Sequence, residues 1–131
     1  MKIKHEQPFI LFSSDVSGHN TLADIINVSS IVSDLQRKEI LFKQLLGKWR
    51  GNLEGAFLVN ASHRDEVLEL ADKYNQTHVL YVDDRRSAYL ITVADGRQEF
   101  IGTFTRVDKD FALCQDTYTY DPQHDQYWCV K

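Results

Sequence analysis

Two short, continuous apolar runs constrain the fold of this chain more than any other feature. Residues 9–12 read Phe-Ile-Leu-Phe and residues 56–60 read Ala-Phe-Leu-Val-Asn, and polar segments border both runs. Runs of four or five residues are too short for an ordinary helix and are typical of strands that are buried on both faces. We therefore expect both runs to be central strands of a sheet.

Residues at helical spacing follow each predicted strand. The first series is Leu22, Ile25, Ile26, Ser29, Val32 and Leu35. It predicts a long helix over residues 21–46, capped by Asn20 or Thr21 and ended by Gly47. Ser62 is expected to cap a second helix, with Asp65 and Glu66 in the first turn, where the helix dipole favours negative charge.

The second half of the chain has the pattern of antiparallel strands. Predicted strands over residues 77–82 and 87–93 flank a polar hairpin tip, and Asp95-Gly96 marks a turn before a strand over residues 98–107. A last hairpin pairs residues 112–118 with residues 126–130. The whole order predicts an α+β fold, in which two helices pack on one face of a mostly antiparallel sheet.

The length of the chain bears on its organisation. The 131 residues contain no internal repeat and no linker-like segment, so we expect a single domain over residues 1–131. A small sheet with helices on one face leaves its other face uncovered, and several predicted strands look apolar on both sides. We therefore expect an oligomer that buries the second face.

Charge and hydropathy argue against two classes of partner. The 15 Lys and Arg residues are outnumbered by 19 Asp and Glu residues, which gives a net charge of −4 and disfavours binding to nucleic acid. No apolar run approaches the roughly 20 residues that span a bilayer. The N-terminal residues also lack the apolar stretch of a secretion signal. We expect a cytoplasmic protein without a membrane or nucleic-acid partner.

Cysteine and histidine spacing favours neither a disulfide framework nor a metal site. Cys114 and Cys129 are expected as reduced thiols, although a hairpin between them would bring them near each other. The five histidines are scattered, and none pairs with a Cys, Asp or Glu at a known ligand spacing. We expect no metal and no cofactor.

The polar loop after the first predicted strand is one candidate site. It contains Ser13, Ser14, His19 and Asn20. Loops at strand ends often carry function, and backbone N–H groups at the start of the following helix would hold a carboxylate or phosphate. The alternative is a plain polar turn whose side chains cap the helix.

The polar loop before the second buried strand is the sharper candidate. Glu54 stands between Gly51 and Gly55, and Trp49 precedes them. Trp49 offers an aromatic face for a base ring or a cation, and Glu54 would hold an ammonium group or act as a base. The alternative is a solvated glutamate in a surface turn and a tryptophan that caps the core.

The ordered series of these features resembles the small phage-encoded enzymes that degrade S-adenosylmethionine (SAM), the SAM hydrolase or SAM lyase family. Gly47-Lys48-Trp49-Arg50 is similar to a Gly-x-Tyr-Arg element of that family, and Glu54 stands where its members carry an important glutamate. The resemblance extends over nearly the whole chain. Its other parts are residues 10–14, Asn20, and residues 32–35, 70–71, 79–81, 88–90 and 127–131.

The resemblance implies a ferredoxin-like, PII-like fold and a homotrimer with sites between subunits. It also implies a cofactor-independent enzyme that serves phage anti-restriction by depleting SAM. Glu54 would be the catalytic residue. The substrate-binding residues would be Ser13, Ser14, His19, Asn20, Trp49 and Glu54.

The chemistry that this implies is intramolecular. The carboxylate of SAM attacks its own Cγ and displaces methylthioadenosine, which closes homoserine lactone and needs little beyond positioning and desolvation. The alternatives are a hydrolase in which Glu54 activates water to give homoserine, and a non-enzymatic trimeric sensor that binds a nucleotide. A third alternative is an acidic protein that binds a host enzyme directly.

Overall fold

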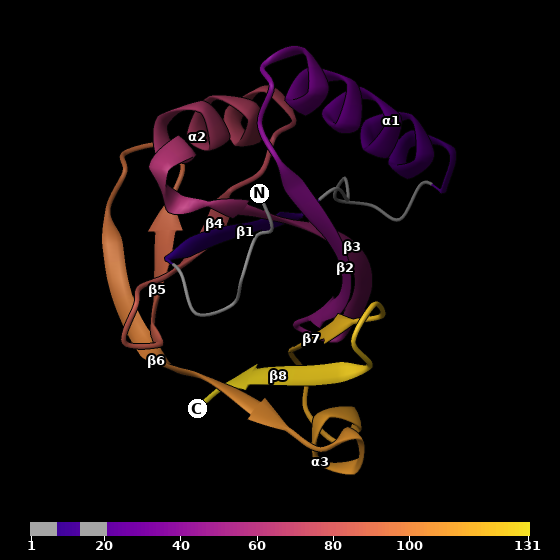
Figure 1. Cartoon of the computed structure of the whole chain (residues 1–131), viewed down its shortest axis with the longest axis vertical. Coiled ribbons are helices and arrows are strands. Elements are labelled where there is room, and N and C mark those ends of the chain that lie inside the picture. Colours follow the sequence, from indigo (N-terminus) through magenta and orange to yellow (C-terminus); the bar gives the residue numbers. More distant parts are fainter. Residues whose placement is uncertain (1–7, 14–20) are drawn as a thin grey trace.

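Eight antiparallel strands form a closed barrel in the computed structural model, which describes residues 8–13 and 21–131 (Figure 1). The strands neighbour one another in the order β1-β3-β2-β7-β8-β6-β5-β4, and β4 pairs with β1 to close the ring. They are β1 (Phe9–Ser13), β2 (Phe42–Trp49), β3 (Asn52–Asn60), β4 (His78–Val82), β5 (Ser87–Thr92), β6 (Gln98–Val107), β7 (Tyr118–Asp121) and β8 (Gln126–Val130).

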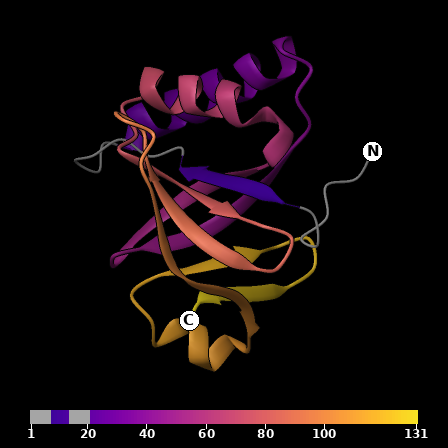
Figure 2. The same cartoon turned by 90° about the vertical axis from the view of Figure 1, so that its left-hand side faces the viewer.

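The described part of the chain contains three α-helices, which lie outside the barrel. The helices α1 (Thr21–Arg37) and α2 (Arg64–Lys73) lie together against one side, and α3 (Lys109–Leu113) lies beside β8 on the other side (Figure 2). Buried Asp34 joins the first two helices, because it accepts hydrogen bonds from Lys73 Nζ at 2.8 Å and Tyr74 Oη at 2.7 Å. Within the described residues, no helix has the length and hydropathy needed to cross a bilayer.

The predicted α+β sheet, with a ferredoxin-like or PII-like arrangement and two helices on one face, is wrong. The first strand pairs with β3 on one side and β4 on the other, and the β7–β8 hairpin connects β2 to β6. Each strand therefore has two neighbours, and the sheet has no open edge. Its second face is the inside of the barrel, so no oligomer is needed to cover this face.

The first helix ends at Arg37 rather than at residue 46, because a Schellman motif stops it. The Ile40 N–H donates to Leu35 O at 2.9 Å and the Glu39 N–H donates to Gln36 O at 3.1 Å. Glu39 has a φ of 57°. Ile40 and Leu35 are both buried and complete the hydrophobic contact of this motif.

Strand β2 replaces the rest of the predicted helix. Gly47, expected as the helix stop, lies within this strand. Two further predictions need correction. Part of the predicted strand over residues 112–118 is α3, which Asp108 caps by accepting the Phe111 N–H at 2.8 Å. Ser62 lies in a 3-10 turn (Ala61–His63) and not at the cap of α2, although Asp65 and Glu66 do occupy the first turn of that helix.

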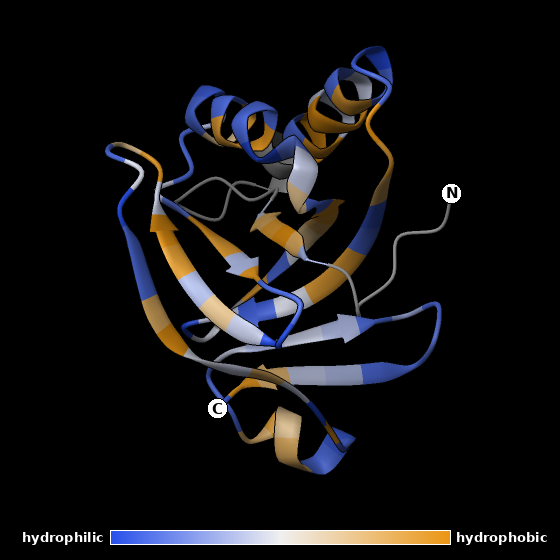
Figure 3. Cartoon of the chain, turned by 60° about the vertical axis from the view of Figure 1, so that its left-hand side comes forward, coloured by the Kyte–Doolittle hydropathy of each residue, from blue (hydrophilic) through white to orange (hydrophobic). Residues whose placement is uncertain are grey.

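Two cores follow from the alternation of side chains along the strands. In β1, Ile10 and Phe12 point outward to the core under α1 and α2, whereas Phe9 and Leu11 point into the barrel. Hydrophobic bands of the two helices face the barrel (Figure 3). The same alternation decides which residues of every other strand line the interior.

Candidate functional site

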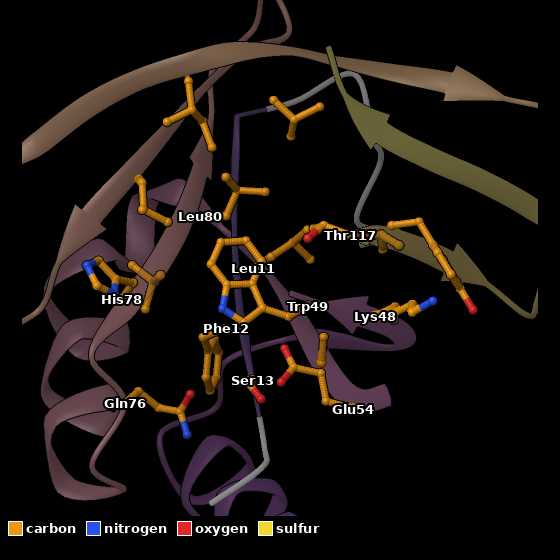
Figure 4. A pocket seen from close by; sticks show the side chains of 18 of the residues that line it. Leu11, Phe12, Ser13, Lys48, Trp49, Glu54, Gln76, His78, Leu80 and Thr117 are labelled. Atoms are coloured by element: carbon orange, nitrogen blue, oxygen red, sulfur yellow. The ribbon is translucent and has the colours of Figure 1, made fainter. Parts of the chain in front are cut away.

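The barrel interior contains a cavity of about 600 Å³, a size typical of ligand sites (Figure 4). One end of it is polar. The residues that line it there are Ser13, Lys48, Trp49, Glu54, Gln76, His78 and Thr117. The remaining wall is mainly apolar and includes Leu11, Leu80, Leu90, Ile101, Phe104, Trp128 and Val130. A ligand with one apolar and one charged portion matches this division.

Strand register gathers the polar side chains at one end. Ser13 and His78 each lie two residues beyond the Leu11–Leu80 pair of β1 and β4. Thr117 directly precedes Tyr118, which pairs with Lys48 of β2. These residues come from segments far apart in the sequence, so only the closed barrel brings them to one mouth.

Glu54 points into the cavity because it shares the alternation of Ala56 and Leu58, which belong to the inner core. It pairs across the β2–β3 ladder with Gly47, and Trp49 pairs with Asn52. Trp49 and Glu54 are therefore diagonal neighbours on one face of the ladder. Figure 4 shows the Trp49 indole and the Glu54 carboxylate on the same side of the cavity as the Ser13 hydroxyl.

Gly47 leaves the position opposite Glu54 without a side chain. A Cβ atom at Gly47 would lie 2.9 Å from the Tyr118 carbonyl oxygen, too close for an ordinary contact. The approach of β7 to β2 therefore requires glycine here. Because Gly47 has no side chain, space remains beside the Glu54 carboxylate.

A tight turn joins β2 to β3 and holds Trp49 in place. Arg50 and Gly51 have φ values of 49° and 87°, as in a type I′ hairpin turn. The Arg50 N–H donates to Thr117 Oγ1 at 3.0 Å, and the Gly51 N–H donates to Asp116 O at 2.9 Å. The Arg50 guanidinium carbon lies 5.0 Å from the centre of the Trp49 ring. The predicted loop over residues 47–55 is thus mostly two paired strands.

Stacked aromatic rings close the inner part of the cavity. The rings of Phe104 and Trp128 are 5.1 Å apart with an angle of 9° between their planes, and Phe9 packs edge-on against Phe104 at 5.4 Å. The Arg86 guanidinium carbon lies 5.0 Å from the centre of the Trp128 ring. Trp128 is only 7% exposed, so its faces are largely covered.

The cysteines are free thiols: Cys114 is exposed and Cys129 is buried. Cys129 is among the residues that line the cavity. Burial raises the pKa of the Cys129 thiol. A raised pKa favours the protonated thiol, which is a weaker nucleophile than the thiolate. Among residues 8–13 and 21–131, no group of three or more His, Cys, Asp or Glu side chains is arranged to hold a metal.

Three of the six predicted site residues line one cavity: Ser13, Trp49 and Glu54. The other three, Ser14, His19 and Asn20, lie outside the described residues.

Sequence reasoning missed Gln76, His78 and Thr117 as cavity residues. His78 does carry a signal, because it starts the alternation that continues inward with Leu80 and Val82. A polar residue that begins an inward-facing apolar series is a candidate for the mouth of a cavity.

Comparison with known proteins adds one finding. The family model described as the S-Adenosylmethionine lyase family matches residues 10–131. No curated protein matches the chain.

Proposed function

The chain belongs to the S-adenosylmethionine lyase family, and from this premise we propose that it cleaves SAM by intramolecular displacement. A carboxylate oxygen of SAM attacks its own Cγ, and a C–O bond forms as the Cγ–S bond breaks. The electron pair of that bond neutralises the sulfonium, so methylthioadenosine and homoserine lactone leave without any proton transfer. The enzyme needs no cofactor for this step.

The observation that carries the proposal is the position of Glu54. Its side chain is half-buried in the cavity, beside Trp49 and close to an apolar wall. We propose that Glu54 binds the ammonium group of SAM and holds the methionine portion folded. Fixing the attacking carboxylate near Cγ while excluding water lowers the barrier of an intramolecular step.

We assign further residues to the same pose. We propose that Ser13 adds a hydrogen bond at the methionine end. We also assign Ser14, His19 and Asn20 to substrate binding, largely through backbone hydrogen bonds of their loop. The biological role that the family resemblance suggests is phage anti-restriction by depletion of SAM.

We further propose a homotrimer. Leu46 and Leu53 project from the outer face of the β2–β3 hairpin and are 53% and 72% exposed. Tyr120 pairs with Leu46 across the ladder, and the tilted ring of Tyr127 packs against Tyr120 with ring centres 4.5 Å apart. These four residues define the outer apolar patch, and Lys48, which pairs with Leu53, lies on the same face. An exposed apolar patch favours self-association. The hairpin that carries Trp49 and Glu54 inward would then lie at a subunit interface.

A product assay in isotopically labelled water tests the reaction. Pure protein is incubated with SAM in H₂¹⁸O, and products are followed by mass spectrometry. The lyase forms unlabelled homoserine lactone first. A hydrolase, in which Glu54 activates water, would form homoserine with the label on the Cγ hydroxyl. Absence of methylthioadenosine would contradict the proposed activity.

Glu54→Gln tests the site itself. The amide is nearly isosteric but lacks the charge that binds an ammonium, so we expect kcat/KM for SAM to fall about 100-fold. Glu99→Gln is the matched control, because Glu99 is exposed on β6 and absent from the cavity wall. Both variants should unfold at the temperature of the parent protein within a few degrees. A Glu54→Gln variant with full activity would place the site elsewhere.

A further inference from the structure

The surroundings of Trp49 distinguish between two modes of substrate recognition by its indole ring. An aromatic face at this site could stack on the adenine of SAM or bind its sulfonium through a cation–π interaction. The two possibilities assign different specificity to the enzyme. In the first, Trp49 recognises any ligand with the base, whether charged or neutral. In the second, it recognises only the cation.

One cation already lies over Trp49. The Arg50 guanidinium carbon is 5.0 Å from the ring centre, and Arg50 is exposed at the hairpin tip rather than part of the cavity wall. The hairpin turn and the hydrogen bond from the Arg50 N–H to Thr117 hold this arrangement. A sulfonium on the cavity side would share the same ring with the guanidinium, and the two positive charges would repel each other.

A neutral base that stacks on Trp49 is not repelled by the Arg50 guanidinium. Stacking of a base on an aromatic ring tolerates a cation on the opposite face, and a guanidinium itself favours flat aromatic partners. Other aromatic rings of the cavity wall already have aromatic partners. Phe104 and Trp128 are buried and stacked on each other. Tyr118 is half-buried like Trp49, but its ring packs against Tyr127 with ring centres 5.9 Å apart.

Resting on the proposed function, we infer that Trp49 is the adenine-stacking residue of the SAM site and that Arg50 is a positioning residue that fixes it. The sulfonium and the methionine portion then lie toward Glu54 and Ser13. Neutral adenine nucleosides with a 5′-thioether, including the product methylthioadenosine, bind the same subsite without any positive charge.

Calorimetric binding of methylthioadenosine to Trp49→Leu tests the assignment. Methylthioadenosine has the base but no cation, so loss of the stacking partner should weaken its binding roughly 10- to 100-fold. Trp49→Phe keeps an aromatic face and should restore most of the affinity. An unchanged affinity in Trp49→Leu, or no binding to the parent protein, would overturn the inference.

Arg50→Gln supplies a second test at an exposed position where the fold is not at risk. If Trp49 stacks on adenine and Arg50 fixes it, removal of the guanidinium raises KM for SAM a few-fold with kcat nearly constant. An unchanged KM would contradict the positioning role of Arg50. If Trp49 binds the sulfonium, removal of the competing cation lowers KM, and this result contradicts the inference.

Cleavage of SAM, measured in parallel, keeps the two proposals apart. Methylthioadenosine binding that depends on Trp49, without cleavage by the parent protein, would contradict the proposed reaction and leave the adenine subsite supported. If the parent protein cleaves SAM but Trp49→Leu binds methylthioadenosine as tightly as the parent does, the adenine subsite is contradicted and the proposed reaction is not.

Discussion

Glu39 has a backbone conformation that its side chain disfavours. Its φ of 57° belongs to the left-handed region, where an L residue with a Cβ atom costs roughly 1 kcal/mol or more relative to glycine. Glycine is the usual residue at this position of a Schellman motif. The motif forms here because burial of Ile40 against the core under α1 and α2 compensates for the strain.

Glu39→Gly is therefore expected to stabilise the protein. The side chain is exposed, so its removal sacrifices little packing. We expect the free energy of unfolding to rise by about 0.5–1 kcal/mol, measured by urea denaturation. Lys38→Gly is the control, because the preceding residue has no left-handed backbone and should lose stability instead. A destabilised Glu39→Gly would mean that the Glu39 side chain makes a stabilising contact.

The same residue explains why the sequence alone misplaces the end of the first helix. Without glycine at position 39, nothing in the sequence marks the stop, and the apolar residues that follow continue at spacings compatible with a helix. In contrast, the burial of residues 9–12 is predicted correctly, because a continuous apolar run is a local signal.

At the scale of elements, β2 is attached to the β7–β8 hairpin by a buried ion pair. Asp121 is fully buried and bonds to Lys43 Nζ. His124 Nδ1 lies 2.9 Å from Asp121 Oδ2, and the Gln123 N–H donates to Asp121 Oδ1 at 3.0 Å. The Lys43 side chain is 12% exposed. A buried carboxylate that loses its cation is strongly destabilised.

Lys43→Met is expected to lower the free energy of unfolding by about 3 kcal/mol, because it leaves the Asp121 carboxylate buried without its lysine. The matched control is Lys73→Met. Lys73 also bonds to a buried carboxylate, Asp34, but its side chain is 58% exposed, so we expect a loss below about 1 kcal/mol. Urea denaturation measures both. Equal losses for the two variants would show that the Lys43 pair has no special part in joining these strands.

Some residues of the candidate site were predictable from the sequence and others were not, and the difference lies in how the strands pair. Trp49 and Glu54 were identifiable from the sequence because a single hairpin brings them together. His78 and Thr117 were not, since they reach the same cavity only through the pairing of β4 with β1 and of β7 with β2. The pairing of β7 with β2 also needs a strand that the predicted helix over residues 21–46 overlaps in large part.

At the scale of the whole molecule, closure of the barrel changes what an oligomer would bury. The inner face of the sheet is enclosed, so association has to use the outer surface. The outer apolar patch, formed by Leu46, Leu53, Tyr120 and Tyr127, lies on the reverse side of the hairpin that carries Glu54. A charge in this patch would remain exposed in a monomer but would be buried in an assembly.

The variant Leu53→Glu tests whether the protein is a monomer or an assembly that buries the outer apolar patch. If the protein is a trimer, sedimentation equilibrium gives the parent protein three times the mass of one chain. Leu53→Glu is expected to shift this mass toward that of a monomer. The free energy of unfolding should change little, because the Leu53 side chain is 72% exposed within one chain. Cleavage of SAM should fall with the fraction of trimer. Leu113→Glu is the control, since Leu113 is 49% exposed on α3, outside the patch. A monomeric parent protein would contradict the trimer, whereas an intact trimer of Leu53→Glu would exclude the outer apolar patch as its interface.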